Sequence, residues 1–171
     1  HQHADFYTGL SYLAEATMDN FGRPWATLLV ANSSDDPSVG IRVVGQDELE
    51  IVSLNATFDP FVRSLEQRKN LPSDEVVLFA GVGVDYSNRR RNKLAGTILS
   101  FNKASQETTQ LRLKSDQHLG NCPKYITARQ LQPFSRNPEV VVDRFDSFDG
   151  SLPDSCRALI ERSSSIYLAT R

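Results

Sequence analysis

The chain has 171 residues, of which 19 are basic and 21 acidic, so its formal net charge at pH 7 is −2. This balance excludes a general attraction to nucleic acids or anionic membranes, because both require clustered positive charge. The length suffices for one domain with a substantial hydrophobic core. No apolar run approaches the roughly 20 residues of a membrane-spanning helix, and the first residues do not read as a secretory leader. We therefore expect a cytoplasmic protein.

Residues that could perform catalysis or bind a metal form no recognisable set in this sequence. Cys122 and Cys156 have neither the number nor the spacing of a disulfide framework or a zinc site. His1, His3 and His118 show no metal-ligand spacing. Ser-His-Asp sets, glycine-rich phosphate loops and paired carboxylates are also not recognisable. The sequence therefore predicts no metal site and identifies no catalytic residue.

The first third of the chain predicts a short helix and two hairpins. Apolar residues at helical spacing predict a helix over residues 6–13 that leads into a strand. Residues 19–22 contain Asp, Asn and Gly, which tolerate turn conformations, and residues 45–48 predict a second turn. The strands expected around these turns span residues 12–18, 25–31, 41–44 and 49–54.

The middle of the chain predicts one helix among further strands. Asp59 followed by Pro60 predicts a helix start, because Asp caps a helix well and proline suits its first position. Strands are expected at residues 75–85, 93–102 and 110–115, which are rich in β-branched residues or alternate between apolar and polar. This pattern is typical of a small antiparallel barrel with helices packed outside it.

The last part of the chain predicts a linker and the start of another unit. Pro, Gly, Asp and Ser are frequent in residues 132–153, which predicts an extended linker. A short helix from about residue 154 to 162 and a strand over residues 166–170 are expected after it. We therefore divide the chain into a barrel domain, residues 1–131, the linker, and residues 154–171, which begin a second unit or dock on the first.

The run Gly-Asn-Cys-Pro-Lys at residues 120–124 could form an anion site. Gly120 permits a tight turn, and Asn121 or Cys122 could then cap a helix that begins at Pro123. Amides at a helix N-terminus attract anions, and Lys124 would add a positive charge. The alternative interpretation is a plain capped helix with a solvated lysine. For the cysteine, an inert thiol is a simpler interpretation than a nucleophile.

Two further features each leave a pair of interpretations open. Residues 88–93, Asn-Arg-Arg-Arg-Asn-Lys, lie between two expected strands and carry four positive charges. Arginine forks could clamp a phosphate there, or the run is a solvated turn whose charges discourage edge-to-edge strand pairing. Trp25 could stack on a flat ring, or it is a buried or interface tryptophan.

Three segments, in order along the chain, resemble the signatures of the FMN-binding split-barrel proteins related to pyridoxamine 5'-phosphate oxidase. Residues 19–29 contain Asp-x-x-Gly-Arg-Pro-Trp before a strand, and residues 85–96 contain an Asp followed by an arginine-rich stretch. Residues 119–126 contain Gly-Asn-Cys-Pro-Lys-Tyr-Ile, an element of fungal and bacterial members. In the second segment Ala95 replaces the Asn that precedes Gly96 in the family. Residues 152–170 resemble the helix and strand that open the family's second half.

The resemblance implies an antiparallel split β-barrel with flanking helices, which binds the flavin nucleotide FMN where two barrel units meet. The second unit would come from a homodimer partner or from a second half of a longer chain. Contacts to the flavin ring or ribityl chain are implied for Arg23, Trp25 and Thr27. Contacts toward the phosphate are implied for Arg90, Asn92, Asn121 and Lys124.

The leading hypothesis for the function is therefore an FMN-binding domain of a flavin-dependent oxidoreductase. The alternative hypothesis is a split-barrel scaffold or dimerisation domain that binds no cofactor. It is motivated by residues 53–59, which lack the family's Ser-x-Lys phosphate motif and end in Asp59, whose charge would repel a phosphate. The sequence does not identify a substrate or an electron donor.

Overall fold

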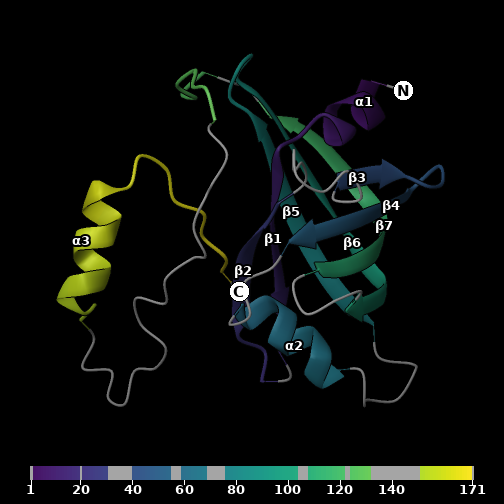
Figure 1. Cartoon of the computed structure of the whole chain (residues 1–171), viewed down its shortest axis with the longest axis horizontal. Coiled ribbons are helices and arrows are strands. Elements are labelled where there is room, and N and C mark those ends of the chain that lie inside the picture. Colours follow the sequence, from purple (N-terminus) through teal and green to yellow (C-terminus); the bar gives the residue numbers. More distant parts are fainter. Residues whose placement is uncertain are drawn as a thin grey trace.

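The computed structural model describes residues 2–19, 21–30, 40–54, 59–68, 76–103, 108–121, 124–131 and 151–170, and Figure 1 shows their arrangement. Within these ranges the chain forms three helices and seven strands. In chain order they are α1 (Gln2–Thr8), β1 (Tyr12–Met18), β2 (Pro24–Val30), β3 (Gly40–Val43), β4 (Glu48–Leu54), α2 (Pro60–Arg68), β5 (Val77–Asp85), β6 (Arg90–Lys103), β7 (Thr108–Asn121) and α3 (Asp154–Arg162). None of the helices in these ranges is long and apolar enough to cross a membrane.

The strands form one antiparallel sheet that closes into a barrel. Their order is β2-β1-β5-β6-β7-β4-β3. Val30 of β2 also pairs with Leu54 of β4, which joins the two sides of the sheet and leaves β3 as an appended strand. Closure satisfies backbone groups that would otherwise lie at open strand edges. The predicted fold class, mainly antiparallel β with flanking helices, is confirmed.

The hydrophobic core fills the barrel, and two helices cover its ends. Leu13 of β1, Ile51 of β4 and Leu111 of β7 are fully buried. Phe61 of α2 is also fully buried in this cluster, and Phe6 of α1 belongs to it. Figure 1 shows α1 and α2 at opposite ends of the barrel. Because each helix buries one apolar face against the strands, the helices exclude water from the barrel ends.

Strands β6 and β7 run alongside one another over most of their length, with register shifts in the middle of β6. One shift lies between Ala95 and Gly96. A Cβ atom added to Gly96 would lie 1.9 Å from the backbone oxygen of Lys114, a distance that no side chain tolerates. The sequence predicts strands over 93–102 and 110–115, but pairing between the two strands extends both of them beyond these limits.

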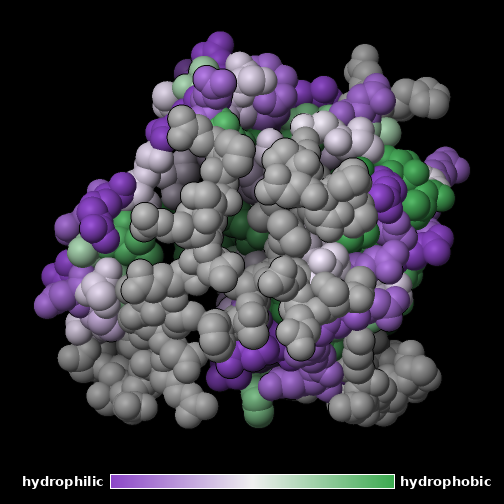
Figure 2. All heavy atoms as spheres, viewed as in Figure 1, coloured by the Kyte–Doolittle hydropathy of each residue, from purple (hydrophilic) through white to green (hydrophobic). Residues whose placement is uncertain are grey.

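The C-terminal part of the described chain lies apart from the barrel core. α3 matches the helix predicted from about residue 154 to 162. It has no buried side chain, and Figure 2 shows apolar side chains beside hydrophilic ones at its place on the left. Residues 163–170 form no strand, so the strand predicted over 166–170 is wrong. Residues 132–150, most of the predicted linker, lie outside the described residues, and the domain boundaries stay predictions.

The helix predicted over residues 6–13 begins and ends earlier, at Gln2–Thr8. Gly9 follows its last residue, and the amide of Gly9 donates to the Asp5 carbonyl at 3.3 Å, which completes the final turn. Glycine stops a helix readily because it lacks the restraint of a Cβ atom. Tyr12 and Leu13, whose apolar side chains suggested helix, belong to the first strand instead.

Glu15 of β1 places a carboxyl group inside the apolar core. Its side chain is 1% exposed, between the inward-facing Leu13 and Thr17. Neither carboxyl oxygen has a hydrogen-bond partner among the described residues. Burial disfavours the charged form and raises the pKa of Glu15 to about 8, from an ordinary value of 4.5. The barrel therefore holds this side chain as a neutral acid near pH 7.

This burial predicts an unusual dependence of stability on pH. Because the pKa of Glu15 is higher in the folded state than its ordinary value, the folded state binds more protons between pH 4.5 and about 8. The free energy of unfolding should therefore fall over that interval, by on the order of 5 kcal/mol at most. Glu15→Gln should remove this slope. Urea unfolding of both proteins at several pH values measures it, and parallel slopes would contradict the prediction.

Candidate functional site

Four alanines form a row on the outer face of the barrel. Ala26 of β2 lies opposite Ala16 of β1, and Ala16 lies opposite Ala80 of β5. Ala80 in turn lies opposite Ala95 of β6. Residues in register on antiparallel strands share a face of the sheet. The row therefore crosses β2, β1, β5 and β6 and gives this face a shallow floor of methyl groups.

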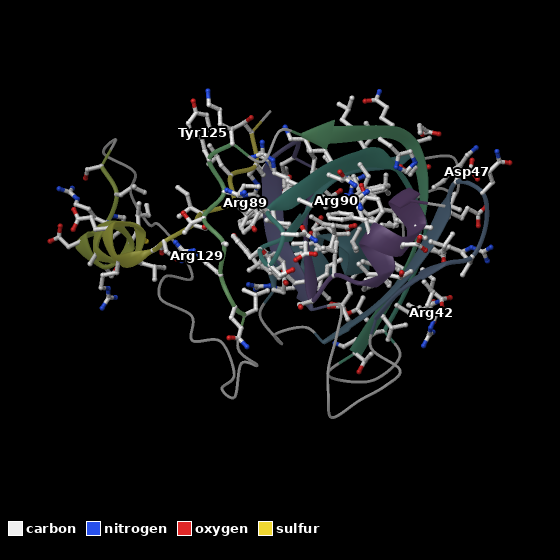
Figure 3. The ribbon with its side chains drawn as sticks, turned by 90° about the horizontal axis from the view of Figure 1, so that it is seen from above. Arg42, Asp47, Arg89, Arg90, Tyr125 and Arg129 are labelled. Carbon is white, nitrogen blue, oxygen red and sulfur yellow. The ribbon has the colours of Figure 1, made fainter. Side chains whose placement is uncertain are left out.

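A groove of about 780 Å³ lies over three members of the alanine row, Ala16, Ala26 and Ala80. Its floor comes from β1, β2, β5 and β6, and the opposite wall comes from two segments outside the sheet. The first segment contributes Tyr125 and Arg129, which Figure 3 shows between the barrel and α3. The second segment is the stretch from Ser164 to Thr170. The groove thus has an apolar floor and a wall made by chain that follows the barrel.

Positive side chains line one end of the groove. Arg91 and Lys93 of β6 line it and alternate with the buried Asn92 and Leu94. The Nε atom of Arg91 is buried and has no hydrogen-bond partner among the described residues. An unsatisfied buried donor is costly, so this nitrogen is suited to receive an acceptor from a ligand. Together the two cations make this end attractive to an anion.

Three tyrosine hydroxyls meet at the same end. The hydroxyls of Tyr12 and Tyr167 are hydrogen-bonded to each other, and the Tyr86 hydroxyl lies 3.4 Å from that of Tyr167. The Tyr86 hydroxyl also donates to Ser165 Oγ at 3.3 Å. The rings of Tyr12 and Tyr167 meet edge to face, with centroids 6.0 Å apart. These contacts join the start of β1, the turn after β5 and the C-terminal segment.

The environment separates the pKa values of these tyrosines. Burial raises the pKa of Tyr167 to about 12. Burial and hydrogen bonds to the other two tyrosines raise the pKa of Tyr12 further. For Tyr86 burial acts in the same direction, but hydrogen bonds with Ser165, Tyr167 and Tyr12 outweigh it and lower the pKa. Tyr86 is therefore the strongest acid of the cluster, and it lines the groove.

The predicted phosphate contacts Arg90 and Asn92 lie on the side of β6 that faces away from the groove. Asn92 is 4% exposed, inside the barrel. The Arg90 guanidinium carbon lies 4.9 Å from the centroid of the Phe6 ring on α1. Because strand side chains alternate, the arginine and lysine one position further on face the groove instead. Leu94, the first apolar residue after the arginine-rich run and a core residue of β6, is the sequence signal that could have shown which positions of the run face the core.

The structure does not form the capped helix predicted after Gly120. Gly120 and Asn121 belong to β7, where Asn121 lies opposite Arg91 of β6. Residues 122–123 lie outside the described residues, and residues 124–131 form a turn and extended chain without a helix. Lys124 is exposed, with its Nζ 5.6 Å from the centroid of the Tyr125 ring. The predicted helix is wrong because strand pairing with β6 continues through residues that favour a turn locally.

Arg23 and Trp25, predicted to contact the flavin ring, are held by Asp19 at the turn between β1 and β2. Asp19 Oδ2 accepts from Arg23 Nε at 2.6 Å and from Trp25 Nε1 at 3.1 Å. Asp19 Oδ1 accepts from the amides of Phe21 and Arg23, each at 2.9 Å. Although burial opposes it, these donors lower the pKa of Asp19 to about 2. The motif Asp-x-x-Gly-Arg-Pro-Trp therefore builds a tight hairpin.

Thr27 links the second strand to the second helix. Its hydroxyl donates to the Asp59 carboxylate, and Asp59 also accepts from the amide of Phe61 at 2.9 Å in the first turn of α2. Burial raises the pKa of Asp59 despite these hydrogen bonds. Asp59 thus caps the helix as the sequence predicts. This contact gives Thr27 a role within the fold.

The seven predicted contacts do not gather at one place. Thr17, next to the Asp19 turn, lies opposite Phe79 of β5, whereas Arg91 lies opposite Val84. Five residues of extended strand span about 16 Å. Arg23 and Trp25 therefore lie at one end of the sheet, and Arg90, Asn92 and Asn121 at the other. Sequence reasoning missed the alanine row and the tyrosine cluster, because both depend on pairing between distant segments.

The Asp19 turn predicts a stability change in Asp19→Asn. The substitution removes the charge from four hydrogen bonds, so the free energy of unfolding should fall by about 1–3 kcal/mol. In the wild type, this stabilisation is complete above the ordinary pKa of 3.8 and is lost as pH falls toward about 2. Thermal unfolding between pH 2 and 7 measures both effects. Asp116→Asn, at an exposed position, is the control, and equal behaviour of the two variants would contradict this role of Asp19.

Comparison with known proteins finds solved structures only. No protein-family model and no curated protein matches the chain. It is similar to a tagged HupZ variant of Group A Streptococcus, at 10% identity over 70% of this chain and 97% of that one, with a TM-score of 0.47. It is similar to the styrene monooxygenase flavin reductase of Pseudomonas putida S12, at 6% identity over 70% and 87%, with a TM-score of 0.39. The FAD and heme binding protein of Mycobacterium smegmatis matches at 16% identity over 92% and 93%, with a TM-score of 0.36.

Proposed function

We propose that the chain binds the flavin nucleotide FMN in the groove over the alanine row, as the cofactor domain of an oxidoreductase. The observation that carries the proposal is the combination of a flat apolar floor with a cationic end. A flavin has the matching shape, because a flat ring system is joined by a flexible chain to a phosphate. The groove volume of about 780 Å³ lies within the range usual for small-molecule and cofactor sites.

The alanine row suits the ring of the ligand. Alanine is the smallest side chain with an apolar methyl group, so Ala16, Ala26 and Ala80, which line the groove in register, allow a flat ring to approach the sheet closely. The exposed Met18 and Leu78 border the row on the side of the Asp19 turn. These side chains would contact an edge of the ring and contribute apolar burial.

The cationic end suits the phosphate. Arg91 offers a buried Nε without a partner among the described residues, and an arginine can bind phosphate oxygens with two donors. Lys93, two residues on, adds a second charge on the same face. Of the predicted phosphate contacts, Asn121 lies opposite Arg91 in the strand register, and its contact with a phosphate stays a prediction. Arg90 and Asn92 are replaced in this proposal by their neighbours in the strand.

When bound, the flavin would supply the electron transfer, and the chain would bind and orient it. The groove lining includes the Tyr86 hydroxyl, whose pKa is lowered by hydrogen bonds that outweigh the opposing effect of burial. A phenol at this cationic end of the groove can donate a hydrogen bond to an oxygen of the bound phosphate. The wall segment from Ser164 to Thr170 would cover the floor of the groove and keep water from the ring.

A scaffold without a cofactor is the alternative function, and exposed apolar side chains favour it. Leu28 and Leu78 are 51% and 60% exposed on the same outer face as the alanine row. A second copy of the chain, or a second barrel half, could cover them. In that case the groove would be part of an interface. Binding of FMN at the predicted cations distinguishes the two functions.

Titration of the protein with FMN tests the proposal, with quenching of the FMN fluorescence as the measure of binding. Arg91→Ala and Lys93→Ala should each weaken binding by about 10-fold, because each removes a hydrogen bond or ion pair to a charged group. Arg90→Ala is the matched control and should leave the affinity unchanged. The loss should shrink as salt rises, because salt screens the phosphate interaction.

Two further titrations separate the contribution of the flavin ring to binding from that of the phosphate. Ala16→Leu should abolish binding of both FMN and riboflavin by raising the floor of the groove. Riboflavin, which lacks the phosphate, should bind equally well to the wild type and to Arg91→Ala. If the wild type binds no FMN at high FMN concentration, the proposed FMN site is wrong and the scaffold function is favoured.

A further inference from the structure

The wall of the groove formed by residues 164–170 is attached mainly through polar groups. The segment has no helix or strand, and Figure 1 shows it returning from α3 to the side of the barrel. Ile166 and Leu168 are 62% and 83% exposed, so their apolar side chains contribute little burial against the barrel. Hydrophobic packing therefore does not fix this segment, which we call the strap.

Hydroxyl groups hold the strap instead. Tyr167 is its partly buried aromatic side chain, and its hydroxyl contacts those of Tyr12 and Tyr86. The Tyr86 hydroxyl also donates to Ser165. On the other side, Arg129 donates through its guanidinium to the hydroxyl of Ser164. The tyrosine contacts join neutral groups, and such hydrogen bonds exchange readily with water, so this part of the attachment is weak and reversible.

The attachment lies at the cationic end of the groove. Tyr86, Arg91 and Tyr167 all line the groove. The Arg129 amide donates to the Tyr86 carbonyl at 3.2 Å, which places the two strap contacts side by side. Opening the tyrosine contacts would release the wall of the groove from the start of β1 and from the turn after β5. Closing them would return the wall over whatever the groove holds.

We propose that residues 164–170 act as a strap that closes the groove, latched by the hydroxyls of Tyr12, Tyr86 and Tyr167, and that a ligand binds when the latch opens. The proposal that the strap opens and closes depends only on contacts within the chain. Its role in gating FMN rests on the proposed function. The two parts can be tested separately, because opening of the strap can be measured without any ligand.

Cleavage by chymotrypsin measures the opening of the strap in the full chain. The bond after Tyr167 should be cut only when the strap is open, and mass spectrometry of the released fragment follows that cut alone. Tyr12→Phe leaves the strap sequence unchanged and removes one hydroxyl of the latch. It should raise the cleavage rate by about 5-fold, the effect expected from losing one neutral hydrogen bond. Tyr86→Phe should act in the same direction.

Tyr125→Phe is the matched control, because Tyr125 lies in the other segment of the groove wall, outside the strap, and its side chain is exposed. It should leave cleavage after Tyr167 unchanged. Cleavage after the buried Tyr7, measured in the same digests, reports global unfolding and should be the same in all variants. Equal cleavage after Tyr167 in the wild type, Tyr12→Phe and Tyr125→Phe would overturn the strap.

Stopped-flow mixing with FMN tests the gating role. In Tyr12→Phe the association rate constant should rise by about 5-fold, because a larger share of molecules is open. Saturating FMN should slow cleavage after Tyr167 in the wild type. If FMN binds with the same rate constant to the wild type and to Tyr12→Phe, the strap does not gate the groove. If FMN does not bind the wild type at all, the proposed function is wrong. Chymotrypsin cleavage after Tyr167 still tests whether the strap opens.

Discussion

Because the sheet closes on itself, every strand of the barrel has one face inside, and that face accepts only side chains that fit the core. On β1 the core takes Leu13, on β5 Phe79, and on β6 Leu94. Once these residues are inside, the positions between them must face outward. The alanine row and the pair Arg91 and Lys93 therefore follow from the packing of the core.

The same constraint explains which parts of the fold could be predicted from the sequence. Local signals sufficed for the first hairpin, for the helix that Asp59 caps and for α3, since turn residues, caps and apolar spacing act over a few positions. Closure of the barrel depends on the pairing of Val30 with Leu54, which no local pattern reveals. The continuation of β7 to Asn121 likewise depends on a partner strand and overrides local turn residues.

The sequence indicated residue types that the candidate groove contains, but not which of them face it. The arginine-rich run predicts a phosphate contact, but the residues named from it, Arg90 and Asn92, face away from the groove of the proposed site. In a strand an error of one position exchanges the two faces, so the correct register matters more than the composition of the run. The tyrosine cluster was out of reach for a different reason. Its members are 155 positions apart at the extreme, and nothing in a single sequence pairs them.

The motif around Asp19 shows that residues named as ligand contacts from a sequence resemblance can instead build a turn. Arg23 and Trp25 are arranged around one carboxylate, which gives each a reason to be present without any cofactor. A sequence resemblance transfers both kinds of residue together. The contacts within the structure are what separate them, because a side chain already bound within its own hairpin has fewer groups to offer elsewhere.

The row formed by Ala16, Ala26, Ala80 and Ala95 has a consequence for how this protein can change over time. The four positions come from separate parts of the gene, yet they make one surface, and the largest of the four side chains would set its height. Selection for a flat floor would therefore act on them jointly. A single enlargement at any position would relax the constraint on the other three, so their identities are expected to be inherited as a set.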